Sequence, residues 1–292
     1  MNIFTKKKEG MRKTERIVVF MLAVLGILSA LTLTTAAAPL SRVPVRWDSV
    51  LGATALDDTA YLIDGVTYVP FRAFCVLASN CEVSWNASTR TATAKAATGA
   101  RITARVGEEV ITYGERVFFT AAPNRIVGDR LYVAIRPLAK CFGINVGWDK
   151  ATRSVYLSRT GKIPRHDAGV YDADALYWLS HIIGAEAKGE PFRGQIAVGN
   201  VVLNRVDSRQ YPNTIYDVIF DKTYGVQFSP TANGTIYAEP PAEAVRAAKV
   251  CLEGYTLSDS ILYFFNPRIA QSHWISQNCT YAFRIGSHVF YV

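Results

Sequence analysis

Residues 182–191 read IIGAEAKGEP, and this stretch organises the C-terminal third of the chain. Apolar side chains recur at spacings of three and four in the turns that lead into it, at Leu176, Leu179, Ile182 and Ile183. This spacing predicts an amphipathic helix with one buried stripe. Gly189 suits the left-handed residue that follows a helix, and Pro191 cannot continue one. We therefore expect a helix that ends near Glu186.

Glu186 would be held at the rigid end of this helix, beside the buried stripe. Because removal from water disfavours a charged carboxylate, burial there would raise the pKa of Glu186. A carboxyl group that stays protonated near neutral pH is the acid catalyst that cleavage of a glycosidic bond requires. The alternative is a surface glutamate near a helix end, since structural carboxylates also show shifted pKa values.

Residues 172–292 predict one domain in which helices precede a small terminal sheet. Asp172 or Asp174 can cap the first helix. Further helices are expected at 192–206, 214–220 and 241–252. Strands are expected at 261–265 and on both sides of Gly286-Ser287, whose residues suit a tight hairpin turn. The fold class is α+β.

Several motifs of this domain stand in a recognisable order. They are EAKGEP at 186–191, GQIAV at 194–198, VVLNRV at 201–206, QFSP at 227–230, LYFFNP at 262–267, Trp274, and RIGSHVF at 284–290. In this order they resemble the catalytic domain of the spore cortex-lytic and cell-wall hydrolases of the SleB type. The resemblance covers residues 172–292 and implies a lysozyme-like, mainly helical domain with a small terminal β-sheet.

The family resemblance implies lytic transglycosylation of the glycan strands of peptidoglycan. Peptidoglycan is therefore the expected partner, and no cofactor is expected. Glu186 matches the catalytic glutamate of the family motif. It would protonate the oxygen between MurNAc and GlcNAc and then accept the proton of the MurNAc 6-hydroxyl, which attacks C1. One carboxyl suffices because the nucleophile belongs to the substrate, in contrast to the two carboxylates of ordinary glycosidases. If water reaches C1 instead of the 6-hydroxyl, the product is a reducing MurNAc end, and this hydrolytic alternative stays open. The choice between spore cortex and vegetative wall as the substrate also stays open.

Six residues are candidates for substrate binding. Gln227, Phe228 and Ser229 follow a glycine in a predicted loop, and loops on rigid scaffolds often carry binding groups. Tyr263, Asn266 and Trp274 suit sugar stacking and hydrogen bonding, and each of the three could equally belong to core or turn packing.

Two further polar residues are expected to support the site rather than to react. Glu190 follows the helix stop and is either structural or a support for Glu186. Asn204 lies within the apolar helix at 192–206, where it either orients the site through a hydrogen bond or caps the helix.

The region 56–158 repeats a pattern. The first copy has YVPFRAF at 68–74, VSWN at 83–86 and TRTAT at 89–93; the second has YVAIRPL at 132–138, VGWD at 146–149 and TRSVY at 152–156. Each copy predicts a strand, a short helix, a strand ending in Trp, a turn and another strand. The two-repeat pattern resembles the N-terminal stalk domain of copper amine oxidases, but it contains no histidine to bind copper.

This β-rich stalk domain is expected to be a spacer or a wall-adhesion module. Further strands are predicted at 101–106 and 116–119. Trp85 and Trp148 are expected in its core, because aromatic side chains on strands favour burial. Residues 159–171 carry Gly, Pro and charge without apolar periodicity, which predicts a linker to the catalytic domain.

Residues 1–37 predict an export signal. Six Lys and Arg residues precede an apolar run at 17–33, and small residues follow at 35–38. Cleavage is expected after Ala37, because Pro39 directly follows Ala38. The alternative is an uncleaved membrane anchor, since a span needs about 17–25 apolar residues. The expected location is the cell wall or spore envelope of a Gram-positive bacterium, with membrane contact only through this segment.

The formal net charge of the chain is +8 at pH 7, and half of it lies in residues 1–38. The mild basic excess that remains is not a nucleic-acid-binding signature. We therefore expect no nucleic acid among the partners.

The five cysteines are Cys75, Cys81, Cys141, Cys251 and Cys279. Cys75 with Cys81, and Cys251 with Cys279, could form bridges, or the thiols could be free and buried. No cysteine has metal-site spacing, and the four histidines form no HExxH pair, so a zinc amidase fits less well. A papain-like peptidase would need a Cys–His dyad. A non-catalytic wall-binding protein remains a further alternative.

Overall fold

The structure is a computed structural model that describes residues 40–47, 56, 60–97, 99–223, 225–270 and 272–292. The chain divides into two units, Met1–Leu40 and Ser41–Val292, and the second is described here by itself. The expected export signal at 1–37 lies outside the described residues. Among the described residues, no helix is long and apolar enough to cross a membrane.

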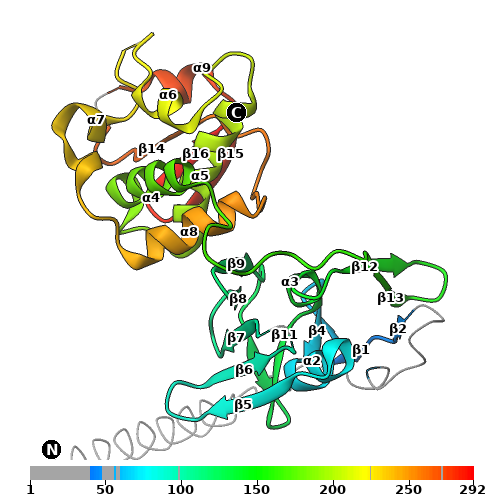
Figure 1. The fold of residues 1–292 in the computed structure, drawn as a ribbon. Coiled ribbons are helices and arrows are strands. Elements are labelled where there is room, and N and C mark those ends of the chain that lie inside the picture. The colour runs from blue at the N-terminus through cyan, green and yellow to red at the C-terminus, as the bar shows by residue number, and fades with distance from the viewer. Residues whose placement is uncertain (1–39, 48–55, 57–59, 98, 224, 271) are drawn as a thin grey trace, which may run out of the picture. The chain divides into compact units, whose positions relative to one another are not determined.

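The N-terminal part of this unit is built mainly from strands (Figure 1). One sheet has the order β1-β3-β4-β11-β10, with β1 Ser41–Arg42, β3 Tyr61–Ile63, β4 Val66–Pro70, β11 Arg130–Ala134 and β10 Arg125–Val127. A second has the order β5-β6-β7-β8-β9, with β5 Glu82–Asn86, β6 Thr91–Lys95, β7 Arg101–Arg105, β8 Val110–Tyr113 and β9 Arg116–Phe119. A third joins β12 Ile144–Asp149, β13 Ser154–Arg159 and β2 Val45–Trp47.

The two segments with the repeated pattern contain the same series of elements. In the first, β4 runs into helix α2 Phe71–Ser79 and then the β5–β6 hairpin; in the second, β11 runs into helix α3 Ile135–Lys140 and then the β12–β13 hairpin. Strands β4 and β11 pair antiparallel, with Val69 opposite Val133. The first strands of the two segments therefore lie side by side at the centre of one sheet.

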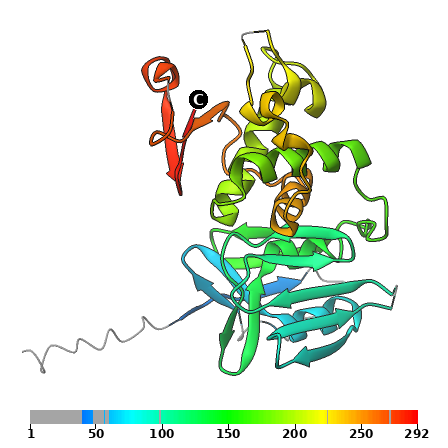
Figure 2. The ribbon, with the colours of Figure 1, turned by 90° about the vertical axis from the view of Figure 1, so that its left-hand side faces the viewer.

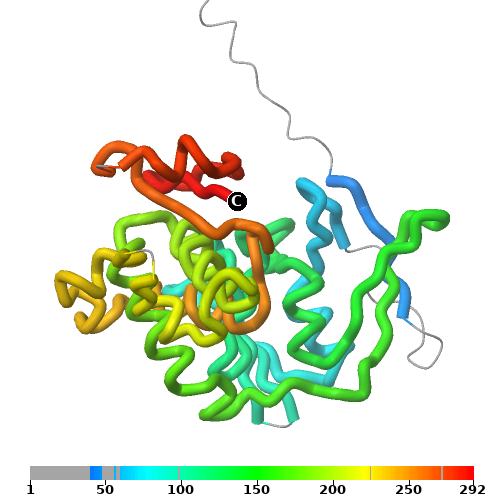
Figure 3. Tube along the Cα trace, turned by 90° about the horizontal axis from the view of Figure 1, so that it is seen from above, coloured from blue at the N-terminus to red at the C-terminus, as the bar shows by residue number. Residues whose placement is uncertain are grey.

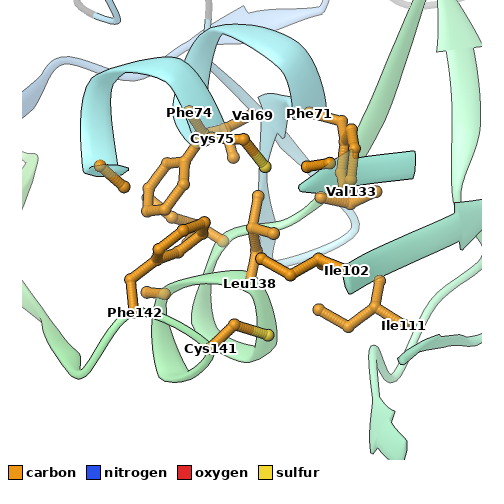
Figure 4. Packing of buried hydrophobic residues seen from close by; sticks show 14 of the residues in the cluster. Val69, Phe71, Phe74, Cys75, Ile102, Ile111, Val133, Leu138, Cys141 and Phe142 are labelled. Atoms are coloured by element: carbon orange, nitrogen blue, oxygen red, sulfur yellow. The ribbon is translucent and has the colours of Figure 1, made fainter. Parts of the chain in front are cut away.

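The core of this part lies between α2, α3 and the strands (Figure 4). The rings of Phe74 and Phe142 pack with their centroids 6.1 Å apart, and Leu138 lies beside them. Trp85 and Trp148 do not belong to this core, so that expectation is wrong: they are 44% and 39% exposed. Phenylalanine and aliphatic side chains fill the space under the helices, and both indoles lie at the edge of this core, where they line surface hollows beside α2 and α3.

The C-terminal part contains most of the helices (Figure 1). The helices are α4 Ala173–Ala187, α5 Phe192–Asp207, α6 Ile215–Phe220, α7 Ser229–Asn233, the 3₁₀ helix η1 Thr235–Tyr237, α8 Ala242–Leu252 and α9 Trp274–Asn278. The strands β14 Tyr263–Phe265, β15 Tyr281–Ile285 and β16 His288–Tyr291 form a sheet of order β14-β16-β15. Figures 2 and 3 show these strands, in orange and red, along one side of the helices. This mixed arrangement agrees with the α+β class.

Close helix packing depends on glycines that meet larger side chains. A Cβ added at Gly199 of α5 would lie 2.7 Å from Cys251 Sγ on α8 and 2.9 Å from Cδ1 of Ile183 on α4. Such distances are far below van der Waals contact, so only glycine lets these three helices approach as they do.

Several local predictions for this part are confirmed and one is wrong. Asp172 caps α4 by accepting a hydrogen bond from the Ala175 N–H at 2.8 Å. The two residues Gly286 and Ser287 turn the β15–β16 hairpin, with Gly286 at φ +56°. Gly189 is not in the left-handed region, because the chain leaves α4 through a right-handed Lys188 and bends at Pro191 instead.

The predicted linker has no regular helix or strand from residue 160 to 172, yet it contacts the β8–β9 turn. The carbonyl oxygen of His166 accepts a hydrogen bond from the Glu115 N–H at 3.0 Å. All five cysteines are free thiols, and four of them are buried, which agrees with the buried-thiol alternative and not with either bridge.

Candidate active site

Glu186 lies in the last turn of α4, on the line of that helix's buried stripe. Leu179, Ile182 and Ile183 in this stripe have no exposed surface. Glu186 follows them by seven, four and three residues, so at 3.6 residues per turn it projects from the same face. The helix therefore carries a carboxyl group into a position that its earlier turns occupy with aliphatic side chains.

Burial alone raises the pKa of Glu186 to about 7. In the described part of the chain, no hydrogen bond or ion pair reaches its carboxyl group. A charged carboxylate at this place would therefore lose its hydration without a compensating partner, which favours the protonated form. This is the protonation state that a general acid needs at neutral pH.

Glu190 connects the corner between α4 and α5 to the terminal hairpin. Its Oε2 accepts a hydrogen bond from the Ser287 N–H at 2.8 Å. A Cβ added at Gly286 would lie 2.0 Å from the same Oε2, so the carboxylate sits directly against the turn. This hydrogen bond ties the corner between α4 and α5 to the hairpin turn.

Helix α5 anchors the segments that lead into the sheet. Asn204 Nδ2 donates hydrogen bonds to the carbonyl oxygens of Ser258 and Ile261, both at 2.9 Å. Asn204 is therefore neither a helix cap nor a group bonded to Glu186; it holds the loop before β14. Gln195 Nε2 donates to the Glu190 carbonyl oxygen at 3.1 Å and to Glu243 Oε2 at 3.3 Å.

Arg205 is a buried residue that the sequence reasoning did not select. Its Nε donates to the Leu262 carbonyl oxygen at 2.8 Å. Its guanidinium lies over the rings of Tyr211, Phe228 and Tyr263, with centroids at 4.9, 5.2 and 5.6 Å. Its Nη1 is buried without a hydrogen-bond partner among the described residues. The signal was present in the sequence, because a cation follows Val201 and Val202 at helical spacing on an apolar face.

The three predicted loop residues do not form one exposed patch. Phe228 is buried, and its ring packs on Phe264 with the centroids 6.3 Å apart. Ser229 begins helix α7, so this residue is not in a loop. Gln227 is half-buried, and its Nε2 donates to the Gly225 carbonyl oxygen at 3.2 Å. Phe228 stays a predicted substrate-binding residue, with its ring in the buried cluster beside Phe264 and the Arg205 guanidinium.

The other three candidates lie around the end of β14. Tyr263 and Trp274 have ring centroids 6.2 Å apart, and Trp274 is 54% exposed. Asn266 Oδ1 accepts a hydrogen bond from the Arg268 N–H at 3.0 Å and so shapes the turn after the strand. No hydrogen bond or ion pair joins any of the six candidates to Glu186 in the residues that the structure describes.

Comparisons with known proteins agree with this division of the chain. The Cell Wall Hydrolase family model matches residues 189–291, and the Copper amine oxidase N-terminal domain model matches residues 50–157. The "Spore cortex-lytic enzyme" of Bacillus cereus is 29% identical over 218 residues, which cover 63% of this chain and 83% of the relative. The chain belongs to the cell wall hydrolase family of spore cortex-lytic enzymes. The hydrolase match begins after Glu186, so the role of that residue rests on its geometry.

Two further relatives of this cell wall hydrolase match the C-terminal part. The "Spore cortex-lytic enzyme" of Bacillus subtilis is 36% identical over 122 residues, which cover 42% of this chain and 39% of the relative. A solved structure, the catalytic domain of the germination-specific lytic transglycosylase SleB from Bacillus anthracis, is 35% identical and covers 43% of this chain and 99% of that chain, with a TM-score of 0.39.

The alternative chemistries find little support in the residues of the hydrolase. Among the described residues, no three His, Cys, Asp or Glu side chains gather into a possible metal site. Cys251 is fully enclosed between α5 and α8, and burial raises the pKa of its thiol, which disfavours the thiolate nucleophile of a papain-like peptidase.

Proposed function

We propose that this chain is a lytic transglycosylase that cleaves the bond between MurNAc and GlcNAc in peptidoglycan, in spore cortex lysis during germination or in cell-wall remodelling. Its membership of the cell wall hydrolase family and its relation to named spore cortex-lytic enzymes support the substrate class. The observation that carries the reaction type is one protonated carboxyl group, Glu186, at the end of a buried helix face.

The reaction uses Glu186 twice. The protonated carboxyl donates its proton to the glycosidic oxygen, the bond between this oxygen and MurNAc C1 breaks, and GlcNAc leaves with a free 4-hydroxyl. The resulting carboxylate accepts the proton of the MurNAc 6-hydroxyl as O6 bonds to C1. The product is a 1,6-anhydro-MurNAc end, and no water is consumed. Glu186 ends each cycle protonated, as it began.

Several finer assignments belong to this proposal. We assign sugar contacts to Trp274, Tyr263 and Asn266, because the exposed indole and the half-buried ring lie together beside β14. Gln227 and Ser229 stay candidate contacts. Phe228 supports Tyr263 indirectly, since both rings pack on the Arg205 guanidinium.

The domain assignment is part of the same proposal. We take 172–292 as a lysozyme-like catalytic domain, 159–171 as a linker and 56–158 as a stalk formed by two copies of one unit. The equal element order of the two segments supports the duplication. Cleavage of peptidoglycan places the chain at the cell wall or in the spore envelope, after export through the segment at 1–37.

The test is mass spectrometry of the muropeptides that the full chain releases from cortex and from vegetative peptidoglycan. Wild type is compared with Glu186→Gln, which keeps the size and loses the proton donor. We expect anhydro-MurNAc products from wild type and none from the variant. Reducing ends would instead establish a hydrolytic muramidase, and an active Glu186→Gln protein would remove Glu186 from the mechanism. If neither protein releases anything, the chain is a non-catalytic wall-binding protein.

A further inference from the structure

The N-terminal part carries two surface grooves, one at each repeated segment. The α2 groove has a volume of about 590 Å³ and lies between α2, β5 and the β10–β11 turn. The α3 groove has a volume of about 650 Å³, and its lining includes α3, β12 and the β3–β4 turn. Both volumes lie in the range of about 300–1,000 Å³ that is typical of ligand sites.

The two grooves are built from equivalent positions of the repeated pattern. Arg72, Val83 and Trp85 line the α2 groove, and Arg136, Val146 and Trp148 line the α3 groove at the same places. The wall opposite each helix comes from the other segment. Residues 129–131, before the second copy, close the α2 groove, and residues 65–67, before the first copy, close the α3 groove. The structure therefore offers two versions of one site.

A segment of this chain with one carboxylate forms part of the wall of the α3 groove. Glu253, Gly254 and Tyr255, which follow α8, belong to its lining. Lys140 Nζ lies 3.1 Å from the Glu253 carbonyl oxygen and 3.4 Å from its Oε2, and Arg116 Nη1 lies 2.7 Å from its Oε1. In the α3 groove, a peptide segment with a carboxylate thus packs beside a cation of α3.

The α2 groove has an apolar surface edged by charged side chains, and the segment after α8 does not line it. Every residue that lines it lies between Pro70 and Leu131. Val76 and Trp85 are each 44% exposed there, and Arg72 and Arg130 are exposed beside them. Asp129 also lines the groove, so two cations face one carboxylate, and the net positive charge beside an apolar surface complements a peptide that carries carboxylates and small apolar side chains.

We propose that the α2 groove binds the acidic peptide stem of peptidoglycan. This inference rests on the proposed function, because that function brings the polymer to this chain. Arg72 and Arg130 pair with the carboxylates of the stem, while Val76 and Trp85 cover its alanine methyl groups. A second contact on the same polymer raises the local concentration of glycan strands near Glu186.

The experiment is cosedimentation of the full chain, with Glu186→Gln to prevent digestion, on insoluble peptidoglycan. Trp85→Ala and Arg130→Glu are compared with Lys95→Glu, an exposed cation on β6 outside the groove. We expect the two groove variants to bind roughly 5- to 10-fold more weakly, in line with loss of one well-placed contact, and Lys95→Glu to bind as the parent does. Thermal unfolding of each variant verifies its fold, and Arg130→Glu keeps the test valid if Trp85→Ala unfolds.

A second arm uses glycan strands from which an amidase has removed the peptides. Binding that depends on the groove should be lost on this material. Equal binding to stripped and intact polymer would overturn the proposal, as would equal losses in Arg130→Glu and Lys95→Glu. The proposed function is tested separately, by measuring cleavage of short soluble glycan fragments with groove variants that keep Glu186. Cleavage there without groove-dependent binding would reject only the α2 site, and groove-dependent binding without cleavage would reject only the transglycosylase.

Discussion

The Ser287 N–H donates a hydrogen bond of 2.8 Å to Glu190 Oε2, and this contact joins residues 97 positions apart in the chain. It holds the β15–β16 turn against the corner between α4 and α5, four residues beyond Glu186. The hairpin turn and the acidic side chain are therefore joined directly, at the corner that follows the helix carrying the candidate general acid.

The first prediction concerns Gly286, which has φ +56° and faces Glu190 Oε2. Gly286→Ala adds a methyl group where the carboxylate lies and also strains the backbone. We expect a loss of unfolding free energy of about 2–4 kcal/mol, measured by urea denaturation.

Gly254 is the matched control for this substitution, because it has φ +82° and nothing within 4 Å of an added Cβ. Gly254→Ala should cost only the backbone strain, about 1 kcal/mol. Combining Gly286→Ala with Glu190→Ala should cost less than the sum of the single losses, since the clash disappears with the carboxylate. Strict additivity would show that the two residues do not interact.

The second prediction concerns the pH dependence of activity. Because the pKa of Glu186 is raised to about 7, its acid form is lost above that pH. The rate of glycan cleavage should fall about tenfold per pH unit in the alkaline range. Release of anhydro-muropeptides over pH 5–9 measures it, and a rate that stays constant to pH 9 would contradict the assignment.

The third prediction concerns stability, which does not depend on any substrate. The folded pKa of Glu186 is about 7, while an unfolded Glu titrates near about 4.3. The folded state therefore binds the extra proton between these values, and stability falls as the pH rises through this window. Ionised Glu186 costs up to about 4 kcal/mol above pH 7.

Glu186→Gln removes this ionisation and keeps the shape of the side chain. The variant should be more stable than wild type at pH 8, by roughly 2–3 kcal/mol, and similar to it at pH 4. Chemical denaturation at the two pH values gives the comparison. If the stability difference between Glu186→Gln and wild type is the same at pH 8 and at pH 4, Glu186 is hydrated and ionises normally.

The fourth prediction concerns Arg205. Arg205→Lys keeps the charge but loses the planar contacts with Tyr211, Phe228 and Tyr263 and the bond from Nε to Leu262. We expect a loss of about 2–3 kcal/mol in unfolding free energy, together with a raised KM, because Tyr263 loses its support. Arg209→Lys, at an exposed position just beyond α5, should change neither quantity.

The fifth prediction concerns Trp274, which is 54% exposed next to Tyr263. Trp274→Ala should leave the unfolding free energy within about 0.5 kcal/mol of wild type, as surface changes usually do. If the indole contacts a sugar, KM should rise roughly tenfold with kcat nearly unchanged. Tyr281→Ala, at a 60% exposed position on β15, serves as the control.

Local order was predictable because short stretches of sequence determine it. The apolar spacing at 192–206 predicted α5, which spans Phe192–Asp207, and Gly286-Ser287 predicted the hairpin turn. Asp172 was expected to cap α4 and does so. In each case the deciding interactions lie within a few residues, so periodicity, capping and turn preferences suffice.

Segments that are distant in sequence decided which side chains are buried and which groups they contact. Phe228, Trp85 and Trp148 are all aromatic residues near predicted turns, yet the first is buried and the other two are exposed. No local pattern states which face of a strand another element will cover. The same holds for Arg205, whose three aromatic neighbours come from three separate segments.

Glu186 itself shows both contributions. The sequence by itself determined that a carboxyl group continues the apolar stripe at the end of a helix. Only the tertiary structure decided that this carboxyl group is left without a partner in the described part of the chain and has a pKa of about 7. Helical spacing sets the direction of a side chain, whereas its hydration depends on how the rest of the fold buries it, which involves residues far along the chain.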